Sequence, residues 1–186
     1  LNKSRTFKHS GASMRALKDV IDATTNKANT RLMLFRWLVF NIAVANDDCH
    51  LKNLSFFVSS EGVQLAPHYD LLATSAYYTK AFAVEKATWP NVRMAIPLGK
   101  ANFFSDVTVQ LVLDAALELG VPDVSARRIL KEVTTRLPEA LGKEMGDIRK
   151  LHARAPEAAK VQLAAEDRLL RVFEHIILKE MLERLR

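Results

Sequence analysis

One segment near the start of the chain constrains the fold more than any other. Residues 32–45 form a run of 14 residues that is apolar apart from Arg36 and Asn41. Such a run is shorter than the roughly 20 residues that a membrane-spanning helix needs. Because its apolar side chains are spread nearly all round a helix, the run predicts a core helix enclosed by other elements. Thr30 is the residue that we expect to cap this helix.

Two patterned segments flank the central helix. Apolar residues at helical spacing between Met14 and Ile21, with Ser13 as a cap, predict a short amphipathic helix before it. After the polar residues that end the central helix, residues 54–58 and 63–65 are separated by a turn that contains glycine. This arrangement predicts a small β-hairpin.

The second half of the chain is expected to be mostly helical. Residues 73–104 have no sustained period and predict a long, partly irregular excursion, of a kind that often carries function. A helical stripe follows Ser105, Ser125 is expected to cap the next helix, and Pro138 is expected to break or restart it. From Pro156 one face of a long final helix is marked by Val161, Ala165, Leu169, Val172, Ile176 and Leu185. The predicted fold class is therefore mainly α (α+β), with about six helices and one hairpin between the second and the third.

Composition narrows the class of protein. The chain has 186 residues, of which 26% are charged and 49% hydrophobic, as in ordinary globular domains. Its one cysteine, Cys49, cannot form an internal disulfide, so a cytoplasmic location is expected. No membrane association is expected, because the longest apolar run is too short to span a membrane. The chain begins at Leu1 with a polar, basic stretch up to Ser13, which predicts that it is cut from a longer protein.

Charge is unevenly distributed. The net charge of +6 is made up of +6 in residues 1–45, −4 in residues 46–126 and +4 in residues 127–186. Basic flanks suit a phosphate-bearing ligand or DNA, and the basic final helix suits DNA or a DNA-binding partner. Solvated helix faces explain the same charges and are the favoured interpretation.

The most informative stretch is polar and lies between the core helix and the hairpin. It reads Asn46-Asp47-Asp48-Cys49-His50-Leu51-Lys52-Asn53, and His68-Tyr69-Asp70 follows just after the hairpin. Both loops can meet at one edge of the fold, where two carboxylates and an amide would converge. Hard oxygen ligands of this kind suit Mg²⁺. A carboxylate base, metal-holding side chains and a nearby cation are the set that phosphoryl transfer requires.

The pattern Asn-x-Asp-x-His-x-Lys-Asn, then a hairpin, then Tyr-Asp-Leu-Leu resembles the catalytic core of the HipA family of bacterial serine/threonine kinases. The resemblance implies a fold like the C-terminal lobe of a kinase, with Asp48 as the catalytic base. Asn53 and Asp70 would be metal ligands, the latter within Tyr69-Asp70-Leu71. The residues implied to bind ATP with its Mg²⁺ are His50, Lys52, Asn53, Tyr69 and Asp70.

The resemblance covers nearly the whole chain. Residues 94–100 resemble a strand-and-loop segment of the family, and residues 119–122 and 126–137 resemble its helical subdomain. Residues 1–186 would then be a single lobe, with a catalytic part at 13–75 and a helical subdomain at 105–186. The sequence departs from the pattern at two places. Ala45 stands where a glycine commonly precedes the motif, and Asp47 puts a second carboxylate beside the implied base.

The family implies a function for the chain. It would transfer the γ-phosphate of ATP to a protein hydroxyl, as the toxin of a toxin–antitoxin system. The implied partners are a helix-turn-helix antitoxin, operator DNA reached through that antitoxin, and a protein substrate, for which an aminoacyl-tRNA synthetase is one candidate. No phosphate-binding glycine loop or strand lysine is found here. We therefore expect a separate N-terminal kinase lobe as a further partner, and we expect this fragment alone to be inactive.

Three other interpretations remain open. The chain could be a non-catalytic module that assembles with an antitoxin or with a separate N-terminal lobe. Cys49 beside His50 could be a nucleophile with its base, although neighbours in sequence rarely point at each other. A zinc site of Cys49, His50 and His68 lacks both a second cysteine and a paired histidine spacing. The nucleophile and the zinc-site interpretations of Cys49 are the least favoured.

Overall fold

The computed structural model describes residues 13–186, and the basic N-terminal stretch with His9 lies outside the described residues. The first helix, α2 (Met14–Ala23), begins as predicted, because the Ser13 hydroxyl accepts a hydrogen bond from the backbone N–H of Ala16 at 3.2 Å. The core helix α3 (Lys27–Ala43) begins earlier than predicted. Its cap is Asn26, whose side chain accepts a hydrogen bond from the backbone N–H of Asn29 at 3.0 Å. The Thr30 hydroxyl instead donates to the Asn26 carbonyl and accepts from Thr24.

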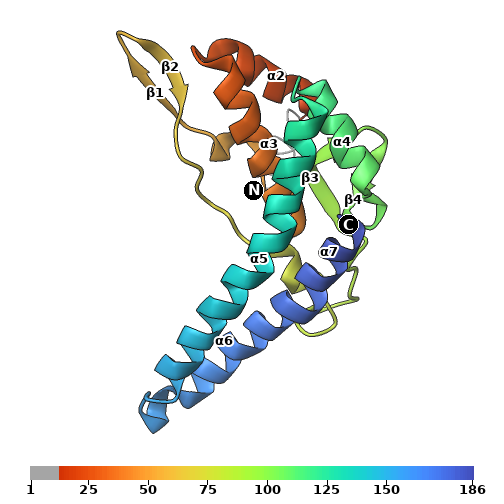
Figure 1. Ribbon diagram of the computed structural model, residues 1–186. Coiled ribbons are helices and arrows are strands. Elements are labelled where there is room, and N and C mark those ends of the chain that lie inside the picture. The colour runs from red at the N-terminus through yellow and green to blue at the C-terminus, as the bar shows by residue number, and fades with distance from the viewer. Residues whose placement is uncertain (1–12) are drawn as a thin grey trace, which may run out of the picture.

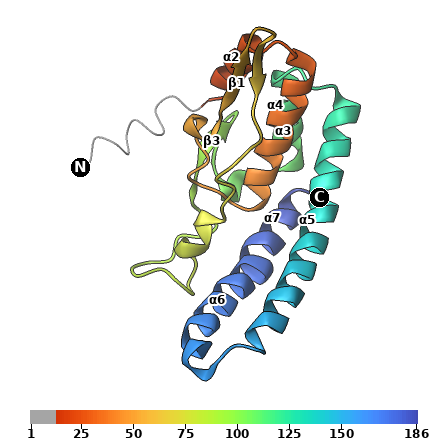
Figure 2. The same ribbon diagram turned by 90° about the vertical axis from the view of Figure 1, so that its left-hand side faces the viewer.

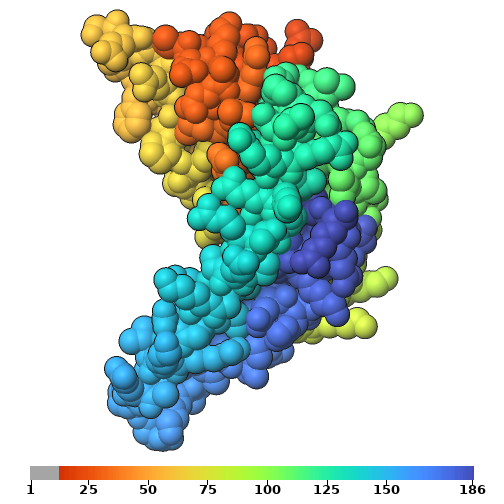
Figure 3. All heavy atoms as spheres, viewed as in Figure 1, coloured from red at the N-terminus to blue at the C-terminus, as the bar shows by residue number. Residues whose placement is uncertain are grey.

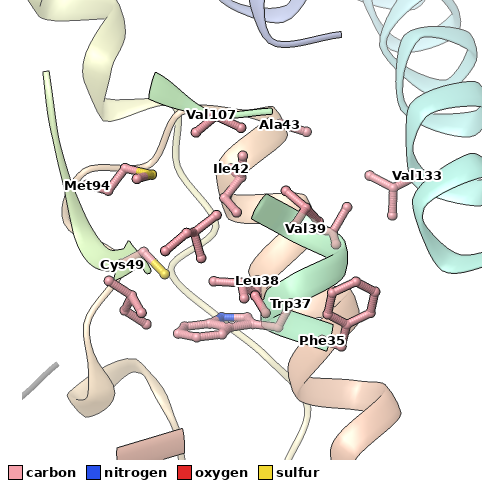
Figure 4. Packing of buried hydrophobic residues seen from close by; sticks show 14 of the residues in the cluster. Phe35, Trp37, Leu38, Val39, Ile42, Ala43, Cys49, Met94, Val107 and Val133 are labelled. Atoms are coloured by element: carbon pink, nitrogen blue, oxygen red, sulfur yellow. The ribbon is translucent and has the colours of Figure 1, made fainter. Parts of the chain in front are cut away.

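Helix α3 is the centre of the hydrophobic core, as its apolar run predicts. Figure 4 shows Trp37, Leu38 and Ile42 on one side of the helix, facing Cys49 and Met94. The opposite side of α3 packs against the long helix α5 (Asp123–His152). Its buried residues are Thr30, Leu34, Phe35, Trp37, Leu38, Val39, Asn41, Ile42 and Ala43. The mainly α fold with small sheets is confirmed.

The predicted hairpin is present and projects from the body of the molecule (Figure 1). Strands β1 (Phe56–Ser59) and β2 (Gly62–Leu65) pair antiparallel, with Phe56 opposite Leu65. Strand β1 begins later than predicted because the 3₁₀ turn η1 (Leu51–Asn53) runs up to Leu54. Gly62 adopts a φ of +111°, which a residue without a Cβ adopts at little cost.

The prediction of only one hairpin is wrong. Residues 73–104 also hold the 3₁₀ turn η2 (Thr74–Tyr78) and a second antiparallel pair, β3 (Arg93–Leu98) and β4 (Ala101–Phe103). Because β3 contains Pro97, the hydrophobic periodicity of the sequence does not predict this strand. The proline is tolerated because a two-stranded sheet leaves one edge of each strand unpaired. The strand-and-loop interpretation of residues 94–100 is confirmed.

Helix α5 is continuous, so the predicted break at Pro138 is wrong. It follows α4 (Val109–Glu118), and it begins at Asp123 rather than behind a Ser125 cap. Proline removes one backbone hydrogen bond from a helix, but packing on both sides of it keeps the helix in place. Ile129 and Val133 are buried before Pro138, and Met145 is buried after it.

The C-terminal helices form an arm together with the far half of α5 (Figures 2 and 3). After the 3₁₀ turn η4 (Glu157–Ala159) come α6 (Lys160–Val172), the π-helical segment η5 (Phe173–Leu178) and α7 (Lys179–Arg184). The predicted apolar face holds near the body, where Val172 and Leu185 are buried. It is wrong at Val161, which is 85% exposed because it lies near the tip of the arm.

None of the helices within residues 13–186 combines the length and the hydropathy that a membrane-spanning segment needs.

Candidate active site

The polar motif directly follows a sharp change of backbone direction at the end of α3. Ala45, fully buried, has a φ of +51°, in the left-handed region where side chains with a Cβ are disfavoured. This conformation explains why glycine is the residue expected there. We call residues 46–53 the catalytic loop and residues 66–73 the Asp70 loop. Asp70 itself has a φ of +56°, so a tight turn positions each loop.

Asn46 links the core helix to both loops. Its amide nitrogen donates to Asn41 Oδ1 at 2.8 Å and to the Asp70 carbonyl at 3.1 Å. Its Oδ1 accepts from the backbone N–H of Asp48 and from the Thr74 hydroxyl, both at 3.2 Å. Asn46 is only 4% exposed, so these bonds satisfy an otherwise costly buried amide. The Asn46 side chain therefore holds α3, the catalytic loop and the Asp70 loop together.

The fold brings Asn53 and Asp70 together, although they lie 17 positions apart in the sequence. The amide nitrogen of Asn53 donates a hydrogen bond to Asp70 Oδ2, and Asn53 Oδ1 accepts the backbone N–H of His50 at 2.9 Å. Of the predicted convergence, the structure shows the contact between the Asn53 amide and the Asp70 carboxylate. Carboxylate and amide oxygens fit Mg²⁺. A metal ion shared by the two side chains would require the Asn53 oxygen to turn toward Asp70.

Asp48 and His50 lie side by side at the front of the catalytic loop. His50 Nε2 is 3.9 Å from Asp48 Oδ1, and the Asp48 side chain is 44% exposed. The His50 side chain is nearly buried, and its Nδ1 is a buried nitrogen without a hydrogen-bond partner among the described residues. Asp48 is thus accessible to a substrate, and the nearly buried His50 ring lies next to it.

Asp47 has a different environment from its neighbour. Its backbone N–H donates to the Thr74 hydroxyl at 2.9 Å, and its Oδ1 accepts from the Ser75 hydroxyl at 3.3 Å. The Asp47 carboxylate is therefore hydrogen-bonded to η2, whereas the Asp48 carboxylate lies near His50. This difference supports Asp48 as the candidate base, in agreement with the spacing of the motif.

Tyr69 and Lys52 lie at the base of the hairpin. The Tyr69 hydroxyl donates to the backbone carbonyl of Lys52 at 2.7 Å and accepts from the Ser55 hydroxyl at 3.3 Å. Tyr69 therefore fastens the two loops to each other. The Lys52 side chain is exposed, and its contact with phosphate, like that of Tyr69 with nucleotide, stays a prediction.

The cysteine interpretations find no support in the structure. Cys49 is buried in the core, and burial, with the charges of Asp48 and Asp70, raises the pKa of its thiol well above the usual range. A thiol of this kind is a poor nucleophile. His68 turns away to the Met33 carbonyl, 3.3 Å from its Nε2, and packs on Trp37. Burial lowers the pKa of His68. Within residues 13–186, His, Cys, Asp and Glu side chains form no three-membered group suited to a metal ion.

Sequence reasoning missed the residues that hold the site together. Asn46 and Thr74 were given no role, although together they connect α3, the catalytic loop and the Asp70 loop. The leading asparagine of the motif was the available signal for Asn46. Thr74 had none, since only the tertiary structure brings it beside the catalytic loop.

Comparison with known proteins identifies related sequences. Residues 1–141 match the family model described as "HipA-like C-terminal domain". The chain is 29% identical over 123 residues to "Putative kinase Y4mE" of Sinorhizobium fredii, covering 65% of this chain and 26% of that protein. It is 27% identical over 135 residues to "Serine/threonine-protein kinase toxin HipA" of Shewanella oneidensis, covering 70% of this chain and 28% of that protein.

A solved structure shares the fold. It is a complex of Shewanella oneidensis HipA with HipB and operator DNA, and it aligns with a TM-score of 0.63 at 20% identity. The alignment covers 94% of this chain and 38% of the matched chain. The chain thus spans about a quarter of the length of the two curated relatives.

Proposed function

The chain belongs to the family of HipA-like C-terminal domains, and from that premise we propose that it supplies the catalytic half of a protein serine/threonine kinase. The observation that carries this proposal is the contact between Asn53 and Asp70, together with an accessible Asp48 in the same loop as Asn53. A base and two oxygen-bearing side chains in one cluster are the parts that phosphoryl transfer requires of this lobe. The kinase names of the two curated relatives support the same class of reaction.

In the proposed reaction the hydroxyl oxygen of a serine or threonine attacks the γ-phosphorus of ATP. The bond from that phosphorus to the β–γ bridging oxygen breaks, and ADP leaves with the electron pair. Asp48 accepts the hydroxyl proton. Asn53 and Asp70 would hold Mg²⁺, which would neutralise charge on the phosphates. His50 positions Asp48, and Lys52 and Tyr69 border the nucleotide at the base of the hairpin.

The assembly of the protein is also part of the proposal. ATP clamping needs a second lobe with a phosphate-binding loop, which would dock above the catalytic loop. The structural neighbour is bound to HipB and operator DNA. By analogy, we place this chain in the toxin of a cytoplasmic toxin–antitoxin pair, with a helix-turn-helix antitoxin and, through it, operator DNA as partners. Its target is a protein hydroxyl, with aminoacyl-tRNA synthetases as the first substrates to test.

The test compares three aspartate variants in the full-length protein. Asp48→Asn should lower the rate of phosphoryl transfer about 10²–10⁴-fold, the range of a general base, while MgATP binding persists. Asp70→Asn should remove the part of ATP binding that depends on Mg²⁺ in a calorimetric titration. Asp114→Asn, on the exposed surface of α4, is the matched control and should change neither quantity.

Absence of MgATP binding by the full-length wild-type protein would overturn the kinase proposal. The lobe would then be better explained as an interaction module that assembles with an antitoxin.

A further inference from the structure

Two features of the sequence have no role in the reaction described so far. One is Asp47, the second carboxylate of the catalytic loop. The other is the excursion after Asp70, which the sequence marked as a candidate functional segment. The structure brings both together at one pocket of about 250 Å³, whose lining residues are Asp47, Tyr78, Thr88, Asn91, Val92, Arg93 and Met94.

The excursion forms one wall of the pocket, and backbone hydrogen bonds hold this wall in place. The backbone N–H groups of Thr88 and Trp89 both donate to the Tyr78 carbonyl, at 3.0 and 3.1 Å, and Asn91 donates to the Thr88 carbonyl at 2.7 Å. Val92 and Met94 are buried and form its apolar base. At the other side, Asp47 is bonded to η2 through Thr74 and Ser75. The pocket therefore exists before any ligand arrives.

The pocket carries one negative and one positive side chain. Of its lining residues, two are charged, Asp47 on the side of the catalytic loop and Arg93 on strand β3. Within the part of the chain that the structure describes, the Arg93 guanidinium makes no hydrogen bond or ion pair. An acidic group entering the pocket is attracted by Arg93 and repelled by Asp47. It would bind nearer to Arg93 than to Asp47.

Size and position identify the ligand class. A volume of about 250 Å³ lies below the range of typical cofactor pockets, and it accommodates one or two side chains. Asp47 belongs to the catalytic loop and directly precedes the candidate base, so the pocket borders the loop that carries Asp48. We propose that the pocket receives the acceptor segment of the protein substrate, and that Arg93 selects an acidic side chain next to the phosphorylated serine or threonine. This inference rests on the proposed kinase function.

The first experiment measures selectivity in the full-length protein. Libraries of peptides centred on serine or threonine, with each flanking position set in turn to Asp, Asn or Lys, are phosphorylated with MgATP. Wild type should favour Asp over Asn at one or more positions by about fivefold, the scale of an exposed charge contact. Arg93→Gln should abolish the preference, and Arg93→Glu should shift it to Lys.

Arg128→Gln is the matched control, because Arg128 is an exposed arginine on α5 and its replacement removes the same charge. It should retain the selectivity of the wild type. Equal selectivity in wild type and Arg93→Gln, or no preference for Asp at any position, would overturn the assignment of Arg93.

A binding measurement separates this inference from the kinase proposal. Fluorescently labelled Ser-Asp and Ser-Lys peptides are titrated into the Asp48→Asn protein with and without Arg93→Gln, and anisotropy is recorded. Binding that favours the acidic peptide only when Arg93 is present supports the pocket even if wild type transfers no phosphate. Phosphoryl transfer without charge-dependent binding supports the kinase and refutes the pocket, and failure of both measurements refutes both.

Discussion

At the scale of single residues, backbone conformation matters as much as side-chain chemistry. Ala45 and Ala43 are both fully buried and lie two positions apart, but only Ala45 has a left-handed φ, of +51°. Ala45 ends the geometry of α3 and starts the catalytic loop. The chain retains a Cβ at this strained position, and the Asn46 hydrogen bonds compensate by fixing the residue that follows.

The two alanines provide a matched test of this conformation. Ala43→Gly should destabilise the protein, since it loses a buried methyl group and places glycine in a helix, at about 1 kcal/mol each. Ala45→Gly loses the same methyl group but relieves left-handed strain. We therefore expect it to cost at least about 1 kcal/mol less in the free energy of unfolding, measured by urea denaturation. Equal losses in the two variants would contradict the role assigned to the backbone of Ala45.

At the scale of elements, helix α5 tests how far packing overrides local preference. It carries Pro138 in its interior and still runs for 30 residues, a length of about 45 Å. Its first half packs against α3, and its second half forms the arm with α6. The packing free energy of those two interfaces offsets the free-energy cost of Pro138, but the cost itself remains.

Replacing the proline should therefore stabilise the helix. Pro138→Ala restores a backbone donor, and we expect the free energy of unfolding to rise by about 1–2 kcal/mol, part of the roughly 3 kcal/mol that separates the two residues in exposed helices. The half-buried ring loses some packing, which lowers the gain. Glu139→Ala, at the exposed neighbouring position, should change stability by less than about 0.5 kcal/mol. A loss of stability in Pro138→Ala would show that packing of the ring outweighs the missing hydrogen bond.

At the scale of the whole molecule, the two halves of the chain are joined by α3 and α5. Besides their apolar contact, Arg36 of α3 donates to Glu132 of α5 at 3.0 Å, and Arg136 donates to the same carboxylate at 3.1 Å. The hydrogen bond from Arg36, then its charge, lowers the pKa of Glu132 below its usual value. This pair connects residues 96 positions apart in the sequence.

The sign of the resulting pH dependence follows from the lowered pKa. The ionised Glu132 is favoured in the folded state, so its contribution is fully present above the unfolded-state pKa of about 4.5 and is lost as the pH falls through the folded-state value. Glu132→Gln should lower stability at pH 7 by less than about 1 kcal/mol, as for exposed ion pairs. The difference from wild type should shrink in urea denaturation series toward pH 4. A difference that stays constant from pH 7 to pH 4 would rule out the ion pair as its cause.

Much of the candidate site could be predicted from the sequence. Asp48, His50 and Asn53 lie within one loop, so local chain geometry limits how they can be arranged. The hairpin then returns the chain, and with it Asp70, to the same edge of the fold. Asn46, Thr74 and the pocket at Arg93 could not be predicted in this way. Their roles arise from contacts across 24 to 28 positions or more, and these contacts have no local signature.

The sequence by itself determined which segments are helical, which helix is buried, and which oxygen-bearing residues gather at one site, because hydrophobic period and short-range spacing are local properties. Only the tertiary structure decided that α5 continues through Pro138, that residues 93–103 form a second hairpin, and that Asp47 and Asp48 have different environments. In each of these cases burial and hydrogen bonding to distant residues outweigh the local preference, and such contacts exist only once the chain has folded.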